Sequence, residues 1–278
     1  MDLLNIFKEI EKIDPEVYDR LDSRRNAMKQ FTNISGKIAL AAIPFALGSM
    51  FNKAYAQTST GTSVTDVLKY ALTLEYLEAA FYTKGVATAN LIPNAAAVAA
   101  ITTIRNHETA HVNFLKSVLS SMGGAPASPA FDFTAGGTFP AVFSDYNFFL
   151  AIAQTFEDTG VRAYKGQAGN LSGNATVLTA ALSIHSVEAR HAAHIRSMRR
   201  AIGALGATAA LKPWITLNQS GIATSAVNAS YAGEELTTQA NVNVAALGNI
   251  GANSASEAFD EPLTMEQVLP IAGLFIKS

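Results

Sequence analysis

The sequence contains two Glu-x-x-His patterns, Glu108-Thr-Ala-His111 and Glu188-Ala-Arg-His191. Residues three positions apart lie on one face of an α-helix, so a glutamate and a histidine at this spacing can bind the same metal ion. A single Glu-x-x-His pattern occurs often by chance. Two of them, each within a helical segment, indicate a site for two metal ions.

Further glutamates recur at similar distances before the two patterns. Glu75 precedes the first by 33 positions and Glu157 precedes the second by 31, and each is followed seven positions later by a tyrosine, Tyr82 or Tyr164. One glutamate from each of two helices, with Glu-x-x-His from each of the other two, is the ligand set of di-metal carboxylate bundles. We therefore predict Glu75 and Glu157 as ligands. The tyrosines are candidate catalytic residues, as hydrogen-bond donors to ligands or as one-electron donors, with ordinary core tyrosines as the alternative.

The composition limits the chemistry of such a site. The chain has no cysteine, which excludes disulfides, iron–sulfur clusters and thiolate zinc sites. Carboxylate and imidazole ligands suit iron or manganese best, and zinc remains a further candidate. Four ionised glutamates would balance two divalent cations, so we predict two iron ions, or alternatively manganese, as the cofactor. The alternative is that these are solvated helix charges beside unrelated histidines.

Four long helical segments are predicted to position these side chains. The first two are joined by a few residues around 90–93 and the last two by 170–173, so each pair should be antiparallel. About 22 residues, Met122–Phe143, connect the second helix to the third. This connection reaches about 70 Å when extended, whereas a 28-residue helix is about 42 Å long. The sequence thus predicts an all-α bundle with one long crossover between helices two and three. The helices are expected near residues 63–86, 94–121, 144–169 and 174–202, with Ser144 as the N-cap of the third.

The composition changes after the fourth helix. Asparagine, serine, threonine, glycine and alanine dominate to about residue 256, and a short apolar helix is predicted near 264–275. We interpret this part as an irregular C-terminal arm that packs on the bundle, with a disordered tail as the alternative. The predicted domains are an export signal with a long leader (1–56), the four-helix bundle (57–205) and the arm (206–278).

Several charged residues near the candidate ligands allow more than one interpretation. Glu78 is an alternative to Glu75, although the tyrosine spacing favours Glu75. Asp158 lies about 100° round the helix from Glu157 and is expected to be solvated or to support a ligand. Three histidines are expected on the surface or behind the ligands: His107, His185 and His194. Four arginines are expected to compensate the C-terminal dipole of the fourth helix: Arg190, Arg196, Arg199 and Arg200.

The first segment resembles a twin-arginine export signal. Ser23-Arg24-Arg25 and Lys29 precede a modestly apolar stretch, and Ala54-Tyr55-Ala56 is a small-x-small site of the kind that signal peptidases cut. Lys37 and Pro44 within the stretch argue against a permanent transmembrane span, although a membrane anchor or a packed helix is the alternative. We expect a periplasmic or otherwise extracytoplasmic location by twin-arginine export, and no membrane span after removal of the signal.

The helical part, about residues 62–203, resembles the ferritin-like superfamily. It is most similar to the bacterial ferritin-like domain family that also includes plant desiccation-related proteins. The resemblance rests on the segment from Leu74 to Ala79 with Phe81-Tyr82 in the first helix, and on the segment from Phe259 to Thr264 near the end. It implies a ferritin-like four-helix bundle. The long arm and the exported location depart from iron-storage ferritins.

The same resemblance implies a role for each ligand. Glu108 and Glu188 would bridge the two ions, and Glu75 and Glu157 would be terminal ligands. The two histidines, His111 and His191, would each bind one ion.

Three functions follow from these features. The first is a redox enzyme, either a ferroxidase that oxidises Fe(II) with O2 or peroxide or a dimanganese enzyme that destroys peroxide. The second is a non-catalytic stress- or desiccation-protective or structural protein, and the third is iron storage in a cage. The expected partners are metal ions and O2 or peroxide, and a homo-oligomer is left open. The net charge of −2 gives no basic surface, so we expect no nucleic-acid binding.

Overall fold

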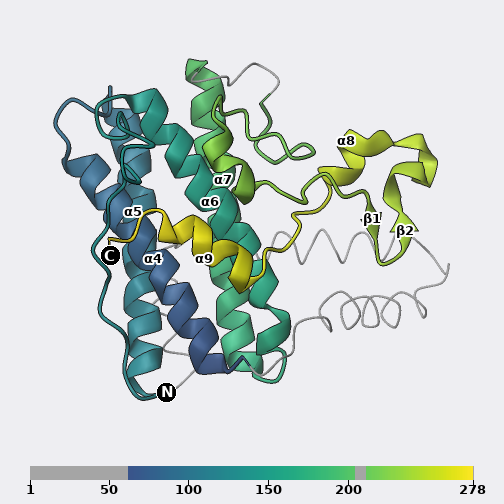
Figure 1. Ribbon diagram of the computed structural model, residues 1–278, viewed down its shortest axis with the longest axis horizontal. Helices are drawn as coiled ribbons and strands as arrows, with labels where there is room; N and C mark the ends of the chain where they lie inside the picture. Colours follow the sequence, from purple (N-terminus) through teal and green to yellow (C-terminus); the bar gives the residue numbers. More distant parts are fainter. Residues whose placement is uncertain (1–61, 204–210, 278) are drawn as a thin grey trace, which may run out of the picture. The chain divides into compact units, whose positions relative to one another are not determined.

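The structure, a computed structural model, describes residues 62–203 and 211–277, all within the unit that spans Lys53–Ser278. The predicted export signal and the predicted boundary after residue 205 lie outside the described residues. Labels follow Figure 1. The four long helices are α4 (Val64–Ala87), α5 (Ala95–Ser120), α6 (Tyr146–Gln167) and α7 (Ala175–Ile202). In the part of the chain that the structure describes, no helix combines the length and apolar character needed to cross a membrane.

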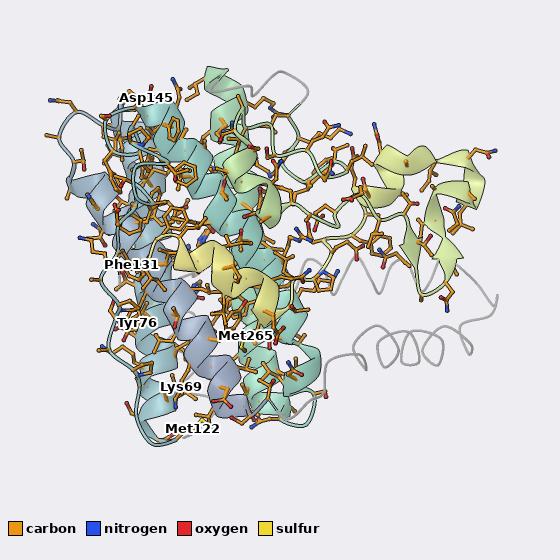
Figure 2. All side chains as sticks on the ribbon, viewed as in Figure 1. Lys69, Tyr76, Met122, Phe131, Asp145 and Met265 are labelled. Atoms are coloured by element: carbon orange, nitrogen blue, oxygen red, sulfur yellow. The ribbon has the colours of Figure 1, made fainter. Side chains whose placement is uncertain are left out.

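The long helices form two antiparallel pairs. α4 packs along α5, α6 packs along α7, and α4 also contacts α6 (Figure 1). Figure 2 labels Met122 and Asp145 at opposite ends of the helices, so the crossover between α5 and α6 runs the length of the bundle. The predicted all-α bundle with one long crossover and an irregular C-terminal region is confirmed.

The helix ends follow their capping residues. Ser63 caps α4 in a capping box with Asp66, and Asn94 and Asn174 cap α5 and α7. The prediction that Ser144 caps α6 was wrong by one residue. Asp145 takes this position, because its carboxylate accepts hydrogen bonds from two free backbone N–H groups of the first turn, at 2.7 and 3.2 Å.

Two apolar clusters fill the bundle. The larger one centres on Phe81, whose ring stacks on Phe149 at 4.8 Å and meets Phe156 edge-on at 5.0 Å. It includes Tyr82, whereas the smaller cluster includes Tyr164. The rings of these two tyrosines therefore lie in two different apolar clusters. Their hydroxyl groups point out of these clusters toward the polar side chains of the bundle.

A short 3-10 helix, η1 (Gly169–Leu171), lies in the connection between α6 and α7. The arm contains η2 (Ser225–Ser230), β1 (Thr238–Gln239), β2 (Val242–Asn243), η3 (Val244–Asn249), α8 (Gly251–Ser256) and α9 (Met265–Gly273). β1 and β2 pair antiparallel with Thr238 opposite Asn243. α9 contacts α4 and α6, and it buries Val268 in the main core. The backbone of Phe131 in the crossover, labelled in Figure 2, pairs with Ile276. The arm thus packs on the bundle around η2 and α9, whereas β1, β2, η3 and α8 contact one another and extend away from the long helices (Figure 1).

Three fully buried arginines join the bundle to the arm. Arg162 on α6 donates to the carbonyl oxygens of Ser230 and Ala232, at 2.6 and 2.7 Å, and pairs with Glu234 at 2.7 Å. On α7, Arg196 pairs with Asp158 and Arg199 donates to the carbonyl of Gly221 at 2.7 Å. Arg199 and Arg200 lie in the last turn of α7, as the dipole interpretation expects. The guanidinium groups of Arg196 and Arg199 in addition make specific buried contacts, with Asp158 and with the arm.

Candidate metal centre

The six predicted ligands meet in the middle of the bundle, where all of them are buried. Their ligand atoms form two groups, each with all atoms within 4.8 Å of one another. Both groups contain Glu108 from α5 and Glu188 from α7. The first group is completed by Glu75 and His111, and the second by Glu157 and His191. The arrangement thus offers two adjacent positions for cations with two carboxylates between them.

The histidines point into these groups through one ring nitrogen. Nδ1 of His111 lies 3.0 Å from Glu75 Oε2, 3.0 Å from Glu108 Oε2 and 3.2 Å from Glu188 Oε1. Nδ1 of His191 lies 2.7 Å from Glu108 Oε1 and 3.3 Å from Glu157 Oε2. Each imidazole therefore faces its own terminal glutamate and the carboxylates that the two groups share.

The two tyrosines hold the terminal glutamates crosswise. Tyr82 of α4 donates to Glu157 of α6 at 2.5 Å, and Tyr164 of α6 donates to Glu75 of α4. Burial, together with the charge of the adjacent glutamate, raises the pKa of each phenol well above its ordinary value. The phenols therefore keep their protons and act as hydrogen-bond donors, which orients both carboxylates without neutralising them.

The charges of the cluster are strongly coupled. Burial raises the pKa of Glu75 to about 7, although His111 acts in the opposite direction. Burial and the charge of Glu108 raise the pKa of Glu188 well above its ordinary value. Burial alone would lower the pKa of His191, but Glu157 and Glu108 raise it to about 10. Without cations, the cluster thus holds protons that limit the repulsion between carboxylates.

The geometry fits bound cations better than a closed hydrogen-bond network. Both carboxylate oxygens of Glu188, Oε1 of Glu108, Oε2 of Glu157 and Nδ1 of His191 are buried and make no hydrogen bond within the described part of the chain. Nδ1 of His191 nevertheless lies only 2.7 Å from Oε1 of Glu108, close in distance but not aligned as a hydrogen bond. Buried lone pairs that converge in this way, from oxygen and imidazole donors, suit divalent transition metals.

A fifth buried glutamate lies beside the cluster. Glu78 is only 3% exposed but belongs to neither ligand group, whereas Glu75 belongs to the first. Burial, with the charges of Glu188 and Glu157, raises the pKa of Glu78 well above its ordinary value. A Cβ atom at Gly160 would lie 3.2 Å from Glu78 Oε1 and 3.4 Å from Glu188 Oε2, so this glycine of α6 leaves room for both carboxylates.

The remaining candidates lie around the ligands. Nδ1 of His107 is 2.9 Å from Nε2 of His191, and His185 contacts the backbone carbonyl of Val161, whereas His194 is exposed. Asp158 is buried and paired with Arg196 rather than solvated. Spacing alone did not identify the His107–His191 contact, because it joins two helices that are connected only through α6.

Comparison with known proteins adds one finding. Residues 63–201 match the family model of a ferritin-like domain, which is half of the chain and contains all six candidate ligands and both tyrosines. A search of curated proteins and a search of solved structures gave no match.

Proposed function

The chain belongs to the ferritin-like domain family, and we propose that it is an exported di-metal oxidoreductase that reacts with O2 or peroxide, most simply a ferroxidase. The observation that carries this proposal is the pair of buried Glu/His groups that share Glu108 and Glu188. Such a cluster is rich in negative charge and in unused lone pairs, and it would be destabilising if it served only the fold.

Each residue has a role in this proposal. Glu108 and Glu188 would hold both cations, because they alone belong to both groups. Glu75 and Glu157 would each hold one cation, and each is oriented by a tyrosine from the opposite helix. Two divalent ions would leave the four ligand carboxylates balanced in charge, and binding them displaces protons from the histidines.

Two bound iron ions, or alternatively manganese, would supply the redox chemistry. As Fe(II), the two ions would together supply two electrons, enough to convert O2 and two protons to H2O2, or H2O2 and two protons to two water molecules. The buried aromatic cluster around Phe81 includes Tyr82, whose hydroxyl contacts Glu157, so apolar side chains border this part of the centre. If O2 or peroxide took one electron from a tyrosine, the phenolic proton would pass to the carboxylate that the tyrosine already contacts, Glu157 for Tyr82 or Glu75 for Tyr164.

Export is part of the proposal. It is supported by Ser23-Arg24-Arg25 and by the small-x-small site that ends at Ala56. We expect the mature chain to begin near residue 57, outside the cytoplasm, and to arrive there folded with its metal. Cell fractionation and N-terminal mass spectrometry test this. An Arg24→Lys/Arg25→Lys variant should remain uncleaved in the cytoplasm.

Metal content tests the centre itself. The full chain would be purified from a host supplied with iron and manganese and measured by elemental analysis, beside a Glu108→Ala/Glu188→Ala variant. The matched control is Glu235→Ala, which removes an exposed glutamate of the arm. We expect about two ions per chain in the wild type and the control, and none in the double variant.

Activity then separates the functions. A wild-type protein that holds two ions should oxidise Fe(II) with O2 or peroxide, or destroy peroxide if it holds manganese. A folded protein without stoichiometric metal would overturn the catalytic proposal and leave a structural or protective role. A large particle that accumulates iron would instead favour storage in a cage.

A further inference from the structure

The two metal positions are built as two copies of one arrangement. Each has a terminal glutamate held by a tyrosine of the opposite helix, and each has a histidine three positions after a shared glutamate. The crossed hydrogen bonds, Tyr82 to Glu157 and Tyr164 to Glu75, show that the copies are related by an approximate two-fold exchange of α4 with α6 and of α5 with α7.

This symmetry is broken at the position four residues before each histidine ligand. On α5 this residue is His107, and on α7 the corresponding residue is Val187. Nδ1 of His107 lies 2.9 Å from Nε2 of His191 across the two helices. The two rings are nearly parallel, with an interplanar angle of 14° and centroids 5.2 Å apart. Valine cannot make the equivalent hydrogen bond. Among the described residues, His111 therefore has no imidazole partner that corresponds to the His107 partner of His191.

The His107 contact fixes which nitrogen of His191 faces the cluster. When His191 donates its Nε2 hydrogen to Nδ1 of His107, its Nδ1 lone pair points at the second group, 3.3 Å from Glu157 Oε2. Among the described residues, no second imidazole contacts Nε2 of His111, and the His111 side chain is more exposed, 11% against 5% for His191. Partners that orient a histidine ligand in this way commonly change metal affinity by about 10- to 100-fold.

We propose that the two metal positions are unequal, and that His107 is a positioning residue that makes the Glu157–His191 position the tighter one. The Glu75–His111 position is then the weaker and more readily exchanged. This inference rests on the proposed function, because it requires that the cluster binds two ions. It predicts a defined order of filling, with the Glu157–His191 position occupied first.

A Mn(II) titration of the metal-free full chain tests the order. Free Mn(II) is counted by its EPR signal, and heat is followed by calorimetry in parallel. We expect two binding steps in the wild type, separated by about 10- to 100-fold in affinity. A Glu157→Gln variant should lose the tighter step, and a Glu75→Gln variant should lose the weaker step.

Variants at the broken position isolate the role of His107. His107→Val copies Val187 and should weaken the tighter step by about 10- to 100-fold, so that the two steps approach each other. His107→Gln offers an amide oxygen as acceptor and should restore part of the difference. Val187→His should strengthen the weaker step if its ring reaches His111. The matched control is His194→Val, which replaces an exposed histidine of α7 and should change neither step.

Two results would overturn the inference. The first is equal affinity of both positions in the wild type, and the second is a His107→Val variant, folded by circular dichroism, whose two steps are unchanged. A purely structural role of His107 would weaken both steps together and would not be rescued by glutamine. Failure of the wild type to bind any Mn(II) or Fe(II) would instead count against the proposed function.

Discussion

Glu157 and Asp158 are neighbours on α6, yet they belong to two buried polar regions with opposite charge balance. Glu157 faces the metal centre, where five buried carboxylates meet two histidines. Asp158 faces the arm interface. We define this interface as the contacts that Arg162, Arg196 and Arg199 make with the arm and with Asp158. There, Arg196 donates to both oxygens of Asp158, and Tyr231 donates to one of them at 2.8 Å.

The difference separates a network whose cations the chain itself compensates from one that requires a ligand. In the arm interface each arginine meets a carboxylate or several carbonyl oxygens, and of its carboxylates only Glu234 keeps one oxygen without a hydrogen bond among the described residues. In the metal centre the negative charges exceed what two histidines can balance, and several carboxylate oxygen atoms lack a hydrogen bond from any described residue. The excess has to be met by protons or by cations. Burial of charge therefore indicates a ligand site only where the protein leaves it uncompensated.

Single substitutions of the two neighbouring residues on α6 should show the largest difference between the two regions, in the free energy of unfolding. Asp158→Ala leaves the Arg196 guanidinium buried without its partner, so we expect a loss of about 3–5 kcal/mol in the free energy of unfolding. Glu157→Gln keeps the size of the side chain and removes one carboxylate from an acidic cluster, although it also removes a partner of His191, so the metal-free protein should lose much less stability than Asp158→Ala does. Urea denaturation of both metal-free variants measures this effect.

In metal content, the order of the same two variants should be reversed. Glu157→Gln should lose at least one ion per chain, whereas Asp158→Ala should keep both at a temperature where it is folded. If Asp158→Ala lost metal and kept its stability, the assignment of the two regions would be wrong.

The pH dependence of stability should differ between the metal-free and metal-loaded protein. Burial raises the pKa of Glu75 to about 7, and the carboxylates around His191 raise its pKa to about 10. Both groups bind protons more tightly when folded, so their contribution is fully present at acidic pH and is lost as the pH rises through 7 and towards 10. Between about pH 5 and pH 7 we expect the shift of Glu75 alone to cost the metal-free protein roughly 2–3 kcal/mol, and the shift of His191 to add to this loss above pH 7.

Bound metal should change this trend, because cations compete with protons for the same ligands and bind more tightly as the pH rises. Melting curves at a series of pH values, with and without stoichiometric Mn(II), measure the difference. A metal-free protein whose melting temperature rises over this range would contradict the expected charge state of the cluster.

Gly166 tests the arm interface without touching a charge. A Cβ atom at this position of α6 would lie 1.9 Å from the carbonyl oxygen of Leu263, so Gly166→Ala should push the arm away from the helix. The hydrogen bond from Leu263 N to the carbonyl of Arg162, 3.1 Å long, would be lost with it. We expect a cost of about 1–3 kcal/mol and faster proteolysis within the arm, with metal content unchanged. Gly173→Ala is the control, because nothing lies within 4 Å of the added atom.

Substitution of Gly160 should give the smallest effect, and this effect should appear in the metal affinity of the centre. Gly160→Ala crowds Glu78 and Glu188 by a few tenths of an ångström, while alanine favours the helix by about 1 kcal/mol. We therefore expect nearly unchanged stability of the metal-free protein and a few-fold weaker Mn(II) binding in the titration described above. Unchanged Mn(II) affinity would show that Glu188 has room to move.

Much of the fold and of the candidate site could be predicted from local sequence. Capping residues such as Asn94 and Asn174 fix helix starts within one or two positions, and the short and long connections fix the pairing of the helices. The in-phase repeat of Glu75 and Glu157 places these glutamates on matching helix faces. These features depend on helix periodicity and chain length, which the sequence determines by itself.

Only the tertiary structure decided which charges meet. Asp158 and Glu157 are both acidic residues of one helix, and nothing in their local sequence tells that one pairs with Arg196 while the other joins the cluster. The contact of His107 with His191 joins α5 to α7, and the burial of Arg199 depends on an arm that follows it by more than ten residues. Compensation of buried charge is set by distances between elements far apart in the chain, and these distances exist only after the elements have packed.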